Sequence, residues 1–266
     1  MLRLQHVQKT FNPGASNEKV ALRGVSLTIA EGEFATVIGS NGAGKSTLLN
    51  VIAGTHLPDA GSIHLGDRDI TWMPEHRRAA WIGRVFQDPL LGTAGSMTIE
   101  ENLAMAAARG RRRRMRLAVN QAMRAHFRDE LAKLGLGLED RLDTRVRFLS
   151  GGQRQALALL MAILQRPLLL LLDEHTAALD PRTARQILEL TERVVREHRL
   201  TTLMVTHNLE HALSMGDRTI MMHEGEAVLD VSGAERAAHT VDSLLQEFAR
   251  VRGERLVDDK ILTTRA

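Results

Sequence analysis

The chain has 266 residues, of which 44% are hydrophobic and 25% charged, with a formal net charge of +3 at pH 7. These values predict a soluble globular protein of one large domain or a domain with a smaller subdomain. The absence of cysteine excludes disulfides and thiolate metal sites, and six Phe, two Trp and no Tyr leave few rings for stacking bases. No apolar run approaches the roughly 20 residues of a membrane-spanning helix, and the N-terminus lacks the apolar core of a signal peptide.

Predicted strands dominate the first third of the sequence. Apolar residues suggest a first strand near 2–7, and strict alternation with polar residues indicates a half-buried strand over 25–29. A third strand, 34–38, leads into a glycine-rich loop that a helix follows. Shorter strands are expected at 62–65 and 81–86, after turn signals such as Pro-Asp-Ala-Gly.

The glycine-rich loop after the third strand reads GSNGAGKST over residues 39–47. The spacing from Gly39 to Gly44-Lys45-Ser46 matches the phosphate-binding loop pattern. Glycines let the backbone approach a polyphosphate, whose oxygens are attracted by backbone N–H groups and by the helix N-terminus. Lys45 supplies an ammonium for the β- and γ-phosphates, and the Ser46 hydroxyl is placed to ligate Mg²⁺.

Helical patterns characterise residues 88–154. From 98 to about 134 apolar residues recur at near-helical spacing, and Gly135 and Gly137 then interrupt the pattern. This segment contains the basic run RGRRRRMR at 109–116. Such a run could contact anionic lipid headgroups or an acidic partner, or it could be an ordinary solvated surface; the solvated surface is the favoured interpretation.

Strands and helices alternate in the rest of the chain. Apolar runs typical of strands occur at 168–172, 202–206, 218–223 and 227–229. A long helix is expected over 182–198, and Glu224-Gly225 forms a hairpin turn. This alternation favours a parallel sheet with helices on its faces, an α/β fold. The tail, 232–266, holds one amphipathic helix near 241–251.

Two carboxylates, Asp173 and Glu174, end the apolar run at 168–172. A buried parallel strand that ends beside the phosphate loop would place Asp173 at the Mg²⁺ ion. Glu174 could then polarise an attacking water. Taken alone, paired acids at a strand end more often cap the next helix.

A second glycine turn, LSGGQ at 149–153, precedes a helical run. A Ser-Gly-Gly turn at a helix N-terminus is another anion site, for the same dipole reason. Because one ATP needs only one phosphate loop, this second site is expected to serve an ATP bound to another copy of the chain.

Six features occur in a fixed order along the chain: GSNGAGKST, Gln87, LSGGQ, LLLLLDE, Ala178-Leu179-Asp180 and His207. In this combination residues 1–230 resemble the nucleotide-binding subunit of an ATP-binding-cassette (ABC) transporter. The resemblance implies an α/β fold with a RecA-like P-loop NTPase core, an N-terminal antiparallel β-subdomain and a helical subdomain. The implied parts of this single domain are a core lobe of 1–87 and 155–231, a helical signature subdomain of 88–154 and a tail of 232–266.

The resemblance also implies roles for single residues. Asp173 is similar to the Walker B aspartate and Glu174 to the catalytic glutamate beside it. Gln87 resembles the Q-loop glutamine, which senses Mg²⁺ or the γ-phosphate and faces the membrane partner, and His207 resembles the switch histidine that contacts the γ-phosphate. The implied catalytic residues are therefore Glu174, His207 and Gln87, and the implied metal ligands are Ser46, Gln87 and Asp173.

The remaining implied residues bind the nucleotide. Ser150–Gln153 resembles the signature that closes over the ATP of the opposite subunit, and Asp180 the D-loop aspartate that communicates between the two sites. Phe11 stands where the family often has an adenine-stacking tyrosine; its ring face should serve, although it could instead be a minor core residue. The implied nucleotide-binding residues are Phe11, Gly39, Ser40, Asn41, Gly42, Ala43, Gly44, Lys45, Ser46, Thr47, Ser150, Gly151, Gly152, Gln153 and Asp180.

These roles imply hydrolysis of ATP with Mg²⁺ at two composite sites in a head-to-tail dimer of two such subunits. The expected function is to energise a membrane transporter, a bacterial importer of small solutes, from the cytoplasmic face of the inner membrane. Separate permease subunits would be direct partners, a substrate-binding protein an indirect one, and nucleic acid none. Residues 91–102 faintly resemble ATPases of uncharacterised amino-acid-type importers.

Other functions are compatible with the same cassette. An exporter or lipoprotein-release ATPase belongs to the same class. A soluble ABC ATPase acting on ribosomes or DNA would carry two cassettes or long coiled coils, and neither pattern occurs here. A purely structural cassette would be expected to lose its catalytic residues, whereas Glu174 and His207 are both present.

Overall fold

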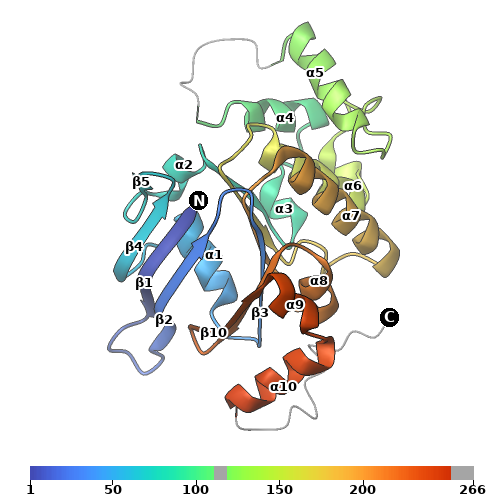
Figure 1. The fold of residues 1–266 in the computed structure, drawn as a ribbon. Coiled ribbons are helices and arrows are strands. Elements are labelled where there is room, and N and C mark those ends of the chain that lie inside the picture. The colour runs from blue at the N-terminus through green and yellow to red at the C-terminus, as the bar shows by residue number, and fades with distance from the viewer. Residues whose placement is uncertain (111–118, 253–266) are drawn as a thin grey trace. The chain divides into compact units, whose positions relative to one another are not determined.

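The computed structural model describes residues 1–110 and 119–252 (Figure 1). The C-terminal end of the tail and most of the basic run therefore lie outside the described residues. Arg109, the first residue of that run, is half-buried, and its guanidinium donates to the carbonyls of Met161 and Ala162 at 2.5 and 2.9 Å. Burial lowers the pKa of Arg109. This arginine is a structural contact rather than a solvated charge.

The chain forms two compact units. Residues 1–78 and 199–266 make up the first, called here the phosphate-loop unit. Residues 79–198 make up the second, the signature unit. These bounds differ from the implied lobes because β6 (Ile82–Val85) and β7 (Leu169–Asp173) pair with each other inside the signature unit.

An antiparallel sheet begins the phosphate-loop unit, in the order β2-β1-β4-β5. Its strands are β1 (Leu2–Phe11), β2 (Lys19–Ile29), β4 (Ala60–Leu65) and β5 (Arg68–Asp69). Leu4 pairs with Leu27 on one side and with Ile63 on the other, and all three side chains are buried. Alternating burial along these strands is the pattern of a sheet with one face on the core. The expected N-terminal antiparallel subdomain is confirmed.

A second set of strands in this unit runs in the order β10-β9-β3-β8. The strands are β3 (Phe34–Gly39), β8 (Thr202–Val205), β9 (Arg218–His223) and β10 (Glu226–Ser232). β3 is parallel to both β8 and β9, and all of its residues are buried. Glu224 and Gly225 have φ values of 44° and 85°, the positive values that a tight two-residue hairpin between β9 and β10 requires.

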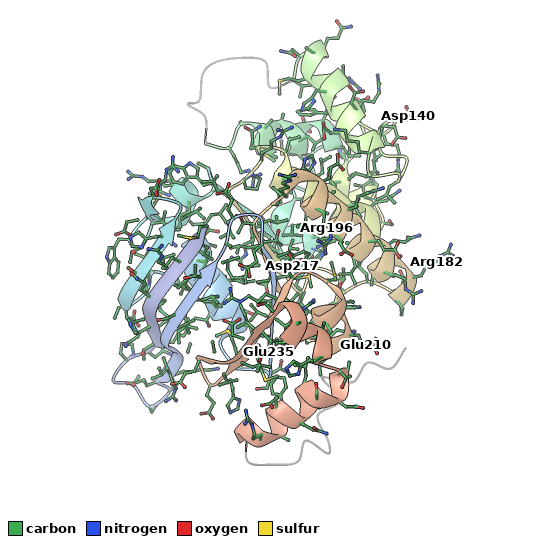
Figure 2. All side chains as sticks on the ribbon, in the orientation of Figure 1. Asp140, Arg182, Arg196, Glu210, Asp217 and Glu235 are labelled. Carbon is green, nitrogen blue, oxygen red and sulfur yellow. The ribbon has the colours of Figure 1, made fainter. Side chains whose placement is uncertain are left out.

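Five helices accompany these strands in the described part of the unit. They are α1 (Lys45–Ala53), α2 (Glu75–Arg78), α8 (Leu209–Ser214), α9 (Gly233–Ala238) and α10 (Val241–Arg252). The exposed side chains of Glu210 and Glu235 mark α8 and α9 in Figure 2. The tail helix expected near 241–251 is present as α10.

Helices predominate in the signature unit. They are α3 (Pro89–Gly92), α4 (Ile99–Ala107), α5 (Gln121–Ala132), α6 (Gly151–Ile163) and α7 (Pro181–His198), with a 3-10 turn at Val146–Phe148. The helical pattern over 98–134 thus contains two described helices rather than one continuous helix. Thr98 begins the first of them through a capping box with Glu101.

None of the helices among the described residues is long and apolar enough to cross a membrane.

Candidate functional site

Three glycines of the phosphate loop have positive φ, and backbone atoms crowd two of them, Gly39 and Gly44. Gly39 ends β3 at φ 154°, and Gly44 precedes α1 at φ 102°. A Cβ on Gly39 would lie 2.4 Å from the carbonyl oxygen of Met222, and one on Gly44 would lie 2.5 Å from that of Ala21. Both neighbours are backbone atoms, so neither position accepts a side chain without moving a strand.

The hairpin between β9 and β10 supports the loop from outside. The N–H of Gly225 donates to the carbonyl of Ala43 at 3.0 Å, and the carbonyl of Gly225 accepts from the N–H of Arg23 at 2.9 Å. The N-cap residue of α1 is Gly44, which has no side chain to cap the helix. A helix N-terminus without a side-chain cap is a common phosphate site, because its N–H groups and its dipole attract an anion.

Lys45 lies inside the loop rather than in solvent. Its side-chain ammonium donates to the carbonyls of Gly39 at 2.7 Å and Ser40 at 3.1 Å, and the residue is 6% exposed. The next residue, Ser46, is exposed, as a hydroxyl that meets a metal ion or a phosphate must be. The loop thus encloses the ammonium of Lys45 and leaves Ser46 accessible to solvent.

His207 follows β8, the neighbour of β3. The two strands are parallel with Val37 opposite Val205, and the N–H of Thr206 donates to Val37 at 3.1 Å. The carboxyl ends of parallel neighbours meet at one edge, where α/β sheets bind their ligands. His207 is half-buried at the same edge as the phosphate loop.

Asn208 fixes the chain after His207. Its side chain accepts from the N–H of His211 at 3.0 Å and caps α8. Burial lowers the pKa of His211; Glu210 opposes this shift and His207 adds to it. Burial is thus the main cause of the lowered pKa of His211, and the neighbouring charges modify it in opposite directions.

Phe11 lies at the end of β1 and is half-buried. The ring of His56 meets it edge-on, with centroids 5.2 Å apart at 79°, and the Lys9 ammonium lies 5.8 Å from its centroid. Lys9 also pairs with Asp59 at 2.7 Å. Adenine stacking on Phe11 stays a prediction.

In the signature unit, three predicted site residues come together at the end of two parallel strands. Val85 of β6 is opposite Leu172 of β7, so Gln87 and Glu174 each follow that pair by two residues. Asp173, the residue directly before Glu174, ends β7, and its carboxylate pairs with the guanidinium of Arg84 at 3.1 Å. Arg84 had no place in the sequence-based prediction, because its partner is 89 positions away.

Glu174 has φ 43°, a left-handed conformation that is uncommon for residues other than glycine. Its carbonyl accepts from the N–H of Ala177 at 3.0 Å, which closes a turn. Non-glycine residues with such backbone values cluster at functional sites, where the surrounding structure enforces them.

His175, the residue after Glu174, helps to hold this turn in place. His175 is 2% exposed, and its Nε2 lies 3.0 Å from the hydroxyl of Thr191 on α7. That hydroxyl donates its only hydrogen to the carbonyl of Ile187 at 2.7 Å. Nε2 of His175 must therefore be the protonated nitrogen. The sequence assigned His175 no role, whereas the structure ties it and the Glu174 turn to α7.

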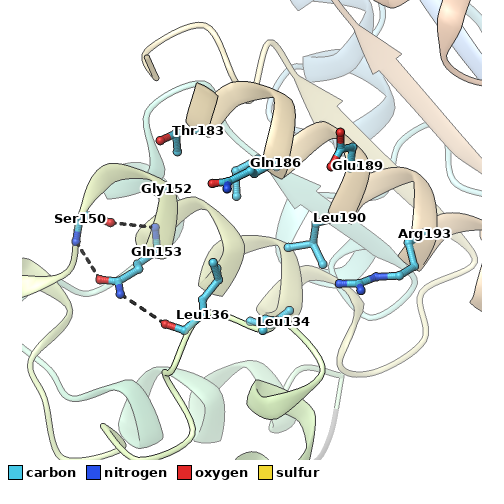
Figure 3. A pocket seen from close by; sticks show the side chains of 12 residues that line it. Leu134, Leu136, Ser150, Gly152, Gln153, Thr183, Gln186, Glu189, Leu190 and Arg193 are labelled. Atoms are coloured by element: carbon cyan, nitrogen blue, oxygen red, sulfur yellow. Dashed lines mark hydrogen bonds between the residues drawn. The ribbon is translucent and has the colours of Figure 1, made fainter. Parts of the chain in front are cut away.

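The signature turn begins α6 through a capping box. The hydroxyl of Ser150 accepts from the N–H of Gln153, and the side-chain oxygen of Gln153 accepts from the N–H of Ser150, both at 3.2 Å (Figure 3). The side-chain amide of Gln153 also donates to Leu136 at 3.5 Å. Ser150 and Gly151 are exposed. The hydrogen bonds between Ser150 and Gln153 thus stabilise the turn, while Ser150 and Gly151 remain exposed to solvent.

A cavity of about 510 Å³ lies beside this turn. One wall is the start of α6 and another is α7, and the loop at 134–136 closes it (Figure 3). Arg193 lines it and donates to the carbonyl of Lys133 at 3.2 Å. α7 lines the cavity with polar side chains, among them Gln186 and Arg193, and with the apolar Leu190, and Leu134 adds a further apolar side chain.

Asp180 is exposed and stands directly before α7. Its carboxylate accepts from the N–H of Thr183 at 3.1 Å, so it caps this helix. Hydrogen bonds from the hydroxyl and the N–H of Thr183 lower the pKa of Asp180. Its predicted role between two sites remains a prediction.

The site residues divide between the units. Those of the phosphate-loop unit are Phe11, residues 39–47 and His207. Those of the signature unit are Gln87, Asp173, Glu174, Asp180 and residues 150–153. Each set gathers at the carboxyl ends of strands or at helix N-termini, the usual places for phosphate chemistry.

Comparison with known proteins agrees with this geometry. A family model described as "ABC transporter" matches residues 22–177. The tyrosine transport ATP-binding protein of Clostridioides difficile (strain R20291) is 46% identical over 248 residues, which are 93% of this chain and 98% of that protein. The methionine import ATP-binding protein MetN 1 of Yersinia pestis bv. Antiqua (strain Antiqua) is 34% identical over 254 residues, 93% of this chain and 70% of that one.

A solved structure has the same fold. The dimeric post-hydrolysis ATP-binding cassette MJ0796, bound to ADP and Pi, superposes with a TM-score of 0.74 at 29% identity, over 87% of this chain and 98% of that one. The expected fold and ATPase activity are thereby confirmed. The chain belongs to the ABC transporter family, as one of its ATP-binding and ATP-hydrolysing subunits.

Proposed function

We propose that the chain energises a bacterial importer of small solutes, with amino acids as the substrate class. The observation that carries this proposal is the 46% identity to a tyrosine transport ATP-binding protein along 98% of that protein's length. The methionine import relative supports the same class. The subunit would act from the cytoplasmic face of the inner membrane as a peripheral protein, held there by its permease.

An uptake assay tests this function. The chain is co-expressed with the permease and the binding protein of an amino-acid importer from the same genome and reconstituted in proteoliposomes. ATP inside the vesicles should drive uptake of a labelled amino acid, with tyrosine, methionine and spermidine compared as competitors. Amino acids should compete and spermidine should not. ATP hydrolysis stimulated without uptake of any amino acid would contradict the proposed substrate class.

Two copies of the chain would complete two ATP sites. Each ATP would lie between the phosphate loop of one copy and the Ser150–Gln153 turn of the other. The exposed faces of Ser150 and Gly151 at a helix N-terminus suit a triphosphate from outside the subunit. The dimeric cassette MJ0796 supports such an assembly.

Mg²⁺ would be held by Ser46, Gln87 and Asp173. The donor set fits this ion, since one hydroxyl, one amide and one carboxylate offer only oxygen ligands, the type that Mg²⁺ selects. The position of the Arg84 guanidinium, 3.1 Å from Asp173, supports this assignment, since a positive charge already lies at this carboxylate. The ion, when bound, would neutralise charge on the phosphates.

The chain's own groups would then carry hydrolysis. Lys45 would turn its ammonium from the loop carbonyls to the β- and γ-phosphates. Glu174 would accept a proton from the attacking water, and His207 would donate a hydrogen bond to the γ-phosphate. These groups act by positioning and by charge stabilisation, the main sources of catalysis in phosphoryl transfer.

The permease would dock on an exposed apolar surface of the signature unit next to Gln87. Leu90 and Leu91 of α3 are 50% and 71% exposed, and Phe148 is 65% exposed. The N–H of Arg147 donates to the carbonyl of Gly95 at 3.0 Å, which ties the two segments together. Exposed clustered apolar side chains mark protein interaction sites.

Charged substitutions separate docking from hydrolysis. Leu91→Asp and Phe148→Asp should abolish co-purification with the permease while the isolated subunit keeps its basal ATPase rate. Met105→Asp, an equally apolar exposed position on α4, is the matched control and should leave association intact. Permease binding by both docking variants at the wild-type level would place the interface elsewhere.

A further inference from the structure

The C-terminal helix α10 is part of the core that lies behind the phosphate loop. Its residues Leu244 and Phe248 are 0% exposed and join one buried cluster with residues of other elements. The other buried members are Ile38, Leu209, Ala212 and Met221. In Figure 1 this helix is the red element that follows α9. Because one face of α10 is buried in this cluster, the helix is part of the hydrophobic core of the phosphate-loop unit.

The cluster touches both site segments of the phosphate-loop unit from behind. Ile38 is the residue directly before Gly39, where the phosphate loop begins. Leu209 comes two residues after His207 and starts α8. Phe248 shares one buried cluster with both residues, and this cluster therefore links the tail to the loop and to the predicted γ-phosphate contact.

A polar contact reinforces the apolar one. Arg236 of α9 donates to the carbonyls of Ala212 at 3.0 Å and Met215 at 2.6 Å, at the C-terminal end of α8, and its Nε donates to the hydroxyl of Thr219 at 2.9 Å. The hydroxyl of Thr36 on β3 also donates to Ala212 at 3.0 Å. A cation on the last carbonyls of a helix satisfies groups that the helix itself cannot.

The two site segments depend on this support to different degrees. β3 is hydrogen-bonded to a parallel strand on each side, β8 and β9. α8 has only six residues, too short to be stable without tertiary packing. Loss of the tail contacts should therefore displace α8, and with it His207, more than the phosphate loop.

We propose that the tail segment 233–252 is a positioning element of the ATPase site, and that Arg236, Leu244 and Phe248 hold α8 so that His207 reaches the γ-phosphate. This inference rests on the proposed role of His207. These three residues touch no substrate and act through α8. The tail would thus set the rate of hydrolysis and leave nucleotide binding to Lys45 and the loop backbone.

The test measures kcat for ATP hydrolysis and the Kd for ATP in the full-length protein. Phe248→Ala and Arg236→Gln should each lower kcat by about tenfold with the Kd nearly unchanged, since a displacement of about 1 Å can cost up to 100-fold in rate. Phe248→Leu should restore most of the activity. Gln246→Ala and Glu235→Ala, at exposed positions of the same two helices, should behave as wild type.

Two further variants separate positioning from simple destabilisation. Leu65→Ala empties a fully buried site in β4, outside the cluster, and should lower stability without changing kcat per folded molecule. In a His207→Ala background, Phe248→Ala should cause no further loss of kcat, because the tail acts through that histidine. Full additivity of the two changes would overturn the proposal. If Phe248→Ala does not fold, an unchanged kcat in Arg236→Gln would overturn it instead.

The His207→Ala variant alone also tells the two proposals apart. A wild-type kcat in His207→Ala would remove the proposed role of His207, and with it the route by which the tail would act. A reduced kcat in His207→Ala together with wild-type rates in the tail variants would overturn only the tail proposal.

Discussion

The guanidinium of Arg84 lies 3.1 Å from the carboxylate of Asp173, and the two side chains are only 11% and 16% exposed. The pair joins neighbouring parallel strands at the edge where Gln87 and Glu174 emerge. Arg84 also stacks on Phe86, with its guanidinium carbon 4.5 Å from the ring centroid. The predicted metal ligand is thus held by a cation from the strand that leads to Gln87.

Removal of this cation should destabilise the protein. Arg84→Met would leave the Asp173 carboxylate largely buried without this ion pair, at a cost of about 2–3 kcal/mol. Urea unfolding should show the loss as a lower midpoint at an unchanged m-value. Arg84→Lys keeps the charge and should recover part of the loss. Asp173→Asn in the Arg84→Met background should also recover stability, because the side chain at position 173 then carries no charge. The same urea midpoint in all of these variants would show that the pair contributes nothing to stability.

Glu174→Gln should lower the rate of ATP hydrolysis by about 10²–10⁴-fold, the usual contribution of a general base, and leave ATP binding intact. A steady-state ATPase assay and an ATP titration measure the two effects separately. Hydrolysis at the wild-type rate would remove Glu174 from the mechanism.

A glycine at the same position separates chemistry from backbone strain. Because Glu174 has φ 43°, Glu174→Gly should relax the turn and keep or raise the stability by up to about 1 kcal/mol. The variant should nevertheless be as inactive as Glu174→Gln. A large loss of stability would mean that the side chain, rather than the backbone, maintains this turn.

Lys45→Met should weaken ATP binding by at least about tenfold, since one buried charge-assisted contact to phosphate contributes about 1.5–3 kcal/mol. Isothermal titration with ATP is the measurement. Lys133→Met removes an exposed lysine, whose ammonium pairs with Glu130 at 2.6 Å in the signature unit, and is the matched control. Equal affinities in the two variants would refute the assignment of Lys45.

Much of this site was predictable from the sequence because its motifs are local. The phosphate loop, the Ser150–Gln153 turn and Asp173-Glu174 each combine a short pattern with a strand or helix that hydrophobic periodicity indicates. The observed bounds of the strands β3, β7, β8 and β9 differ from the expected bounds by at most one or two residues. Local chemistry determines these elements, so one sequence suffices to find them.

The remainder depends on contacts between distant residues. The helices α2, α8 and α9 have four to six residues, too few for a periodic pattern, and were not predicted. The Arg84–Asp173 pair and the contact of His175 with Thr191 join residues on different elements, which no local pattern encodes. Tertiary packing creates these features, and they surround the catalytic residues rather than forming part of any motif.

The burial of His211 predicts a pH dependence of stability. Burial lowers the pKa of His211 from its usual 6.5, so the unfolded chain binds this proton more readily than the folded one. The contribution of His211 to stability is therefore complete above about pH 6.5, declines as the pH falls below that value, and is lost once the pH has passed through the lowered folded-state pKa. His211→Gln should flatten the fall in Tm between pH 7.5 and about pH 5, while Glu210→Gln, which removes the charge that opposes the shift, should steepen it. Identical Tm profiles for wild type and His211→Gln would show that this histidine is protonated equally well in both states.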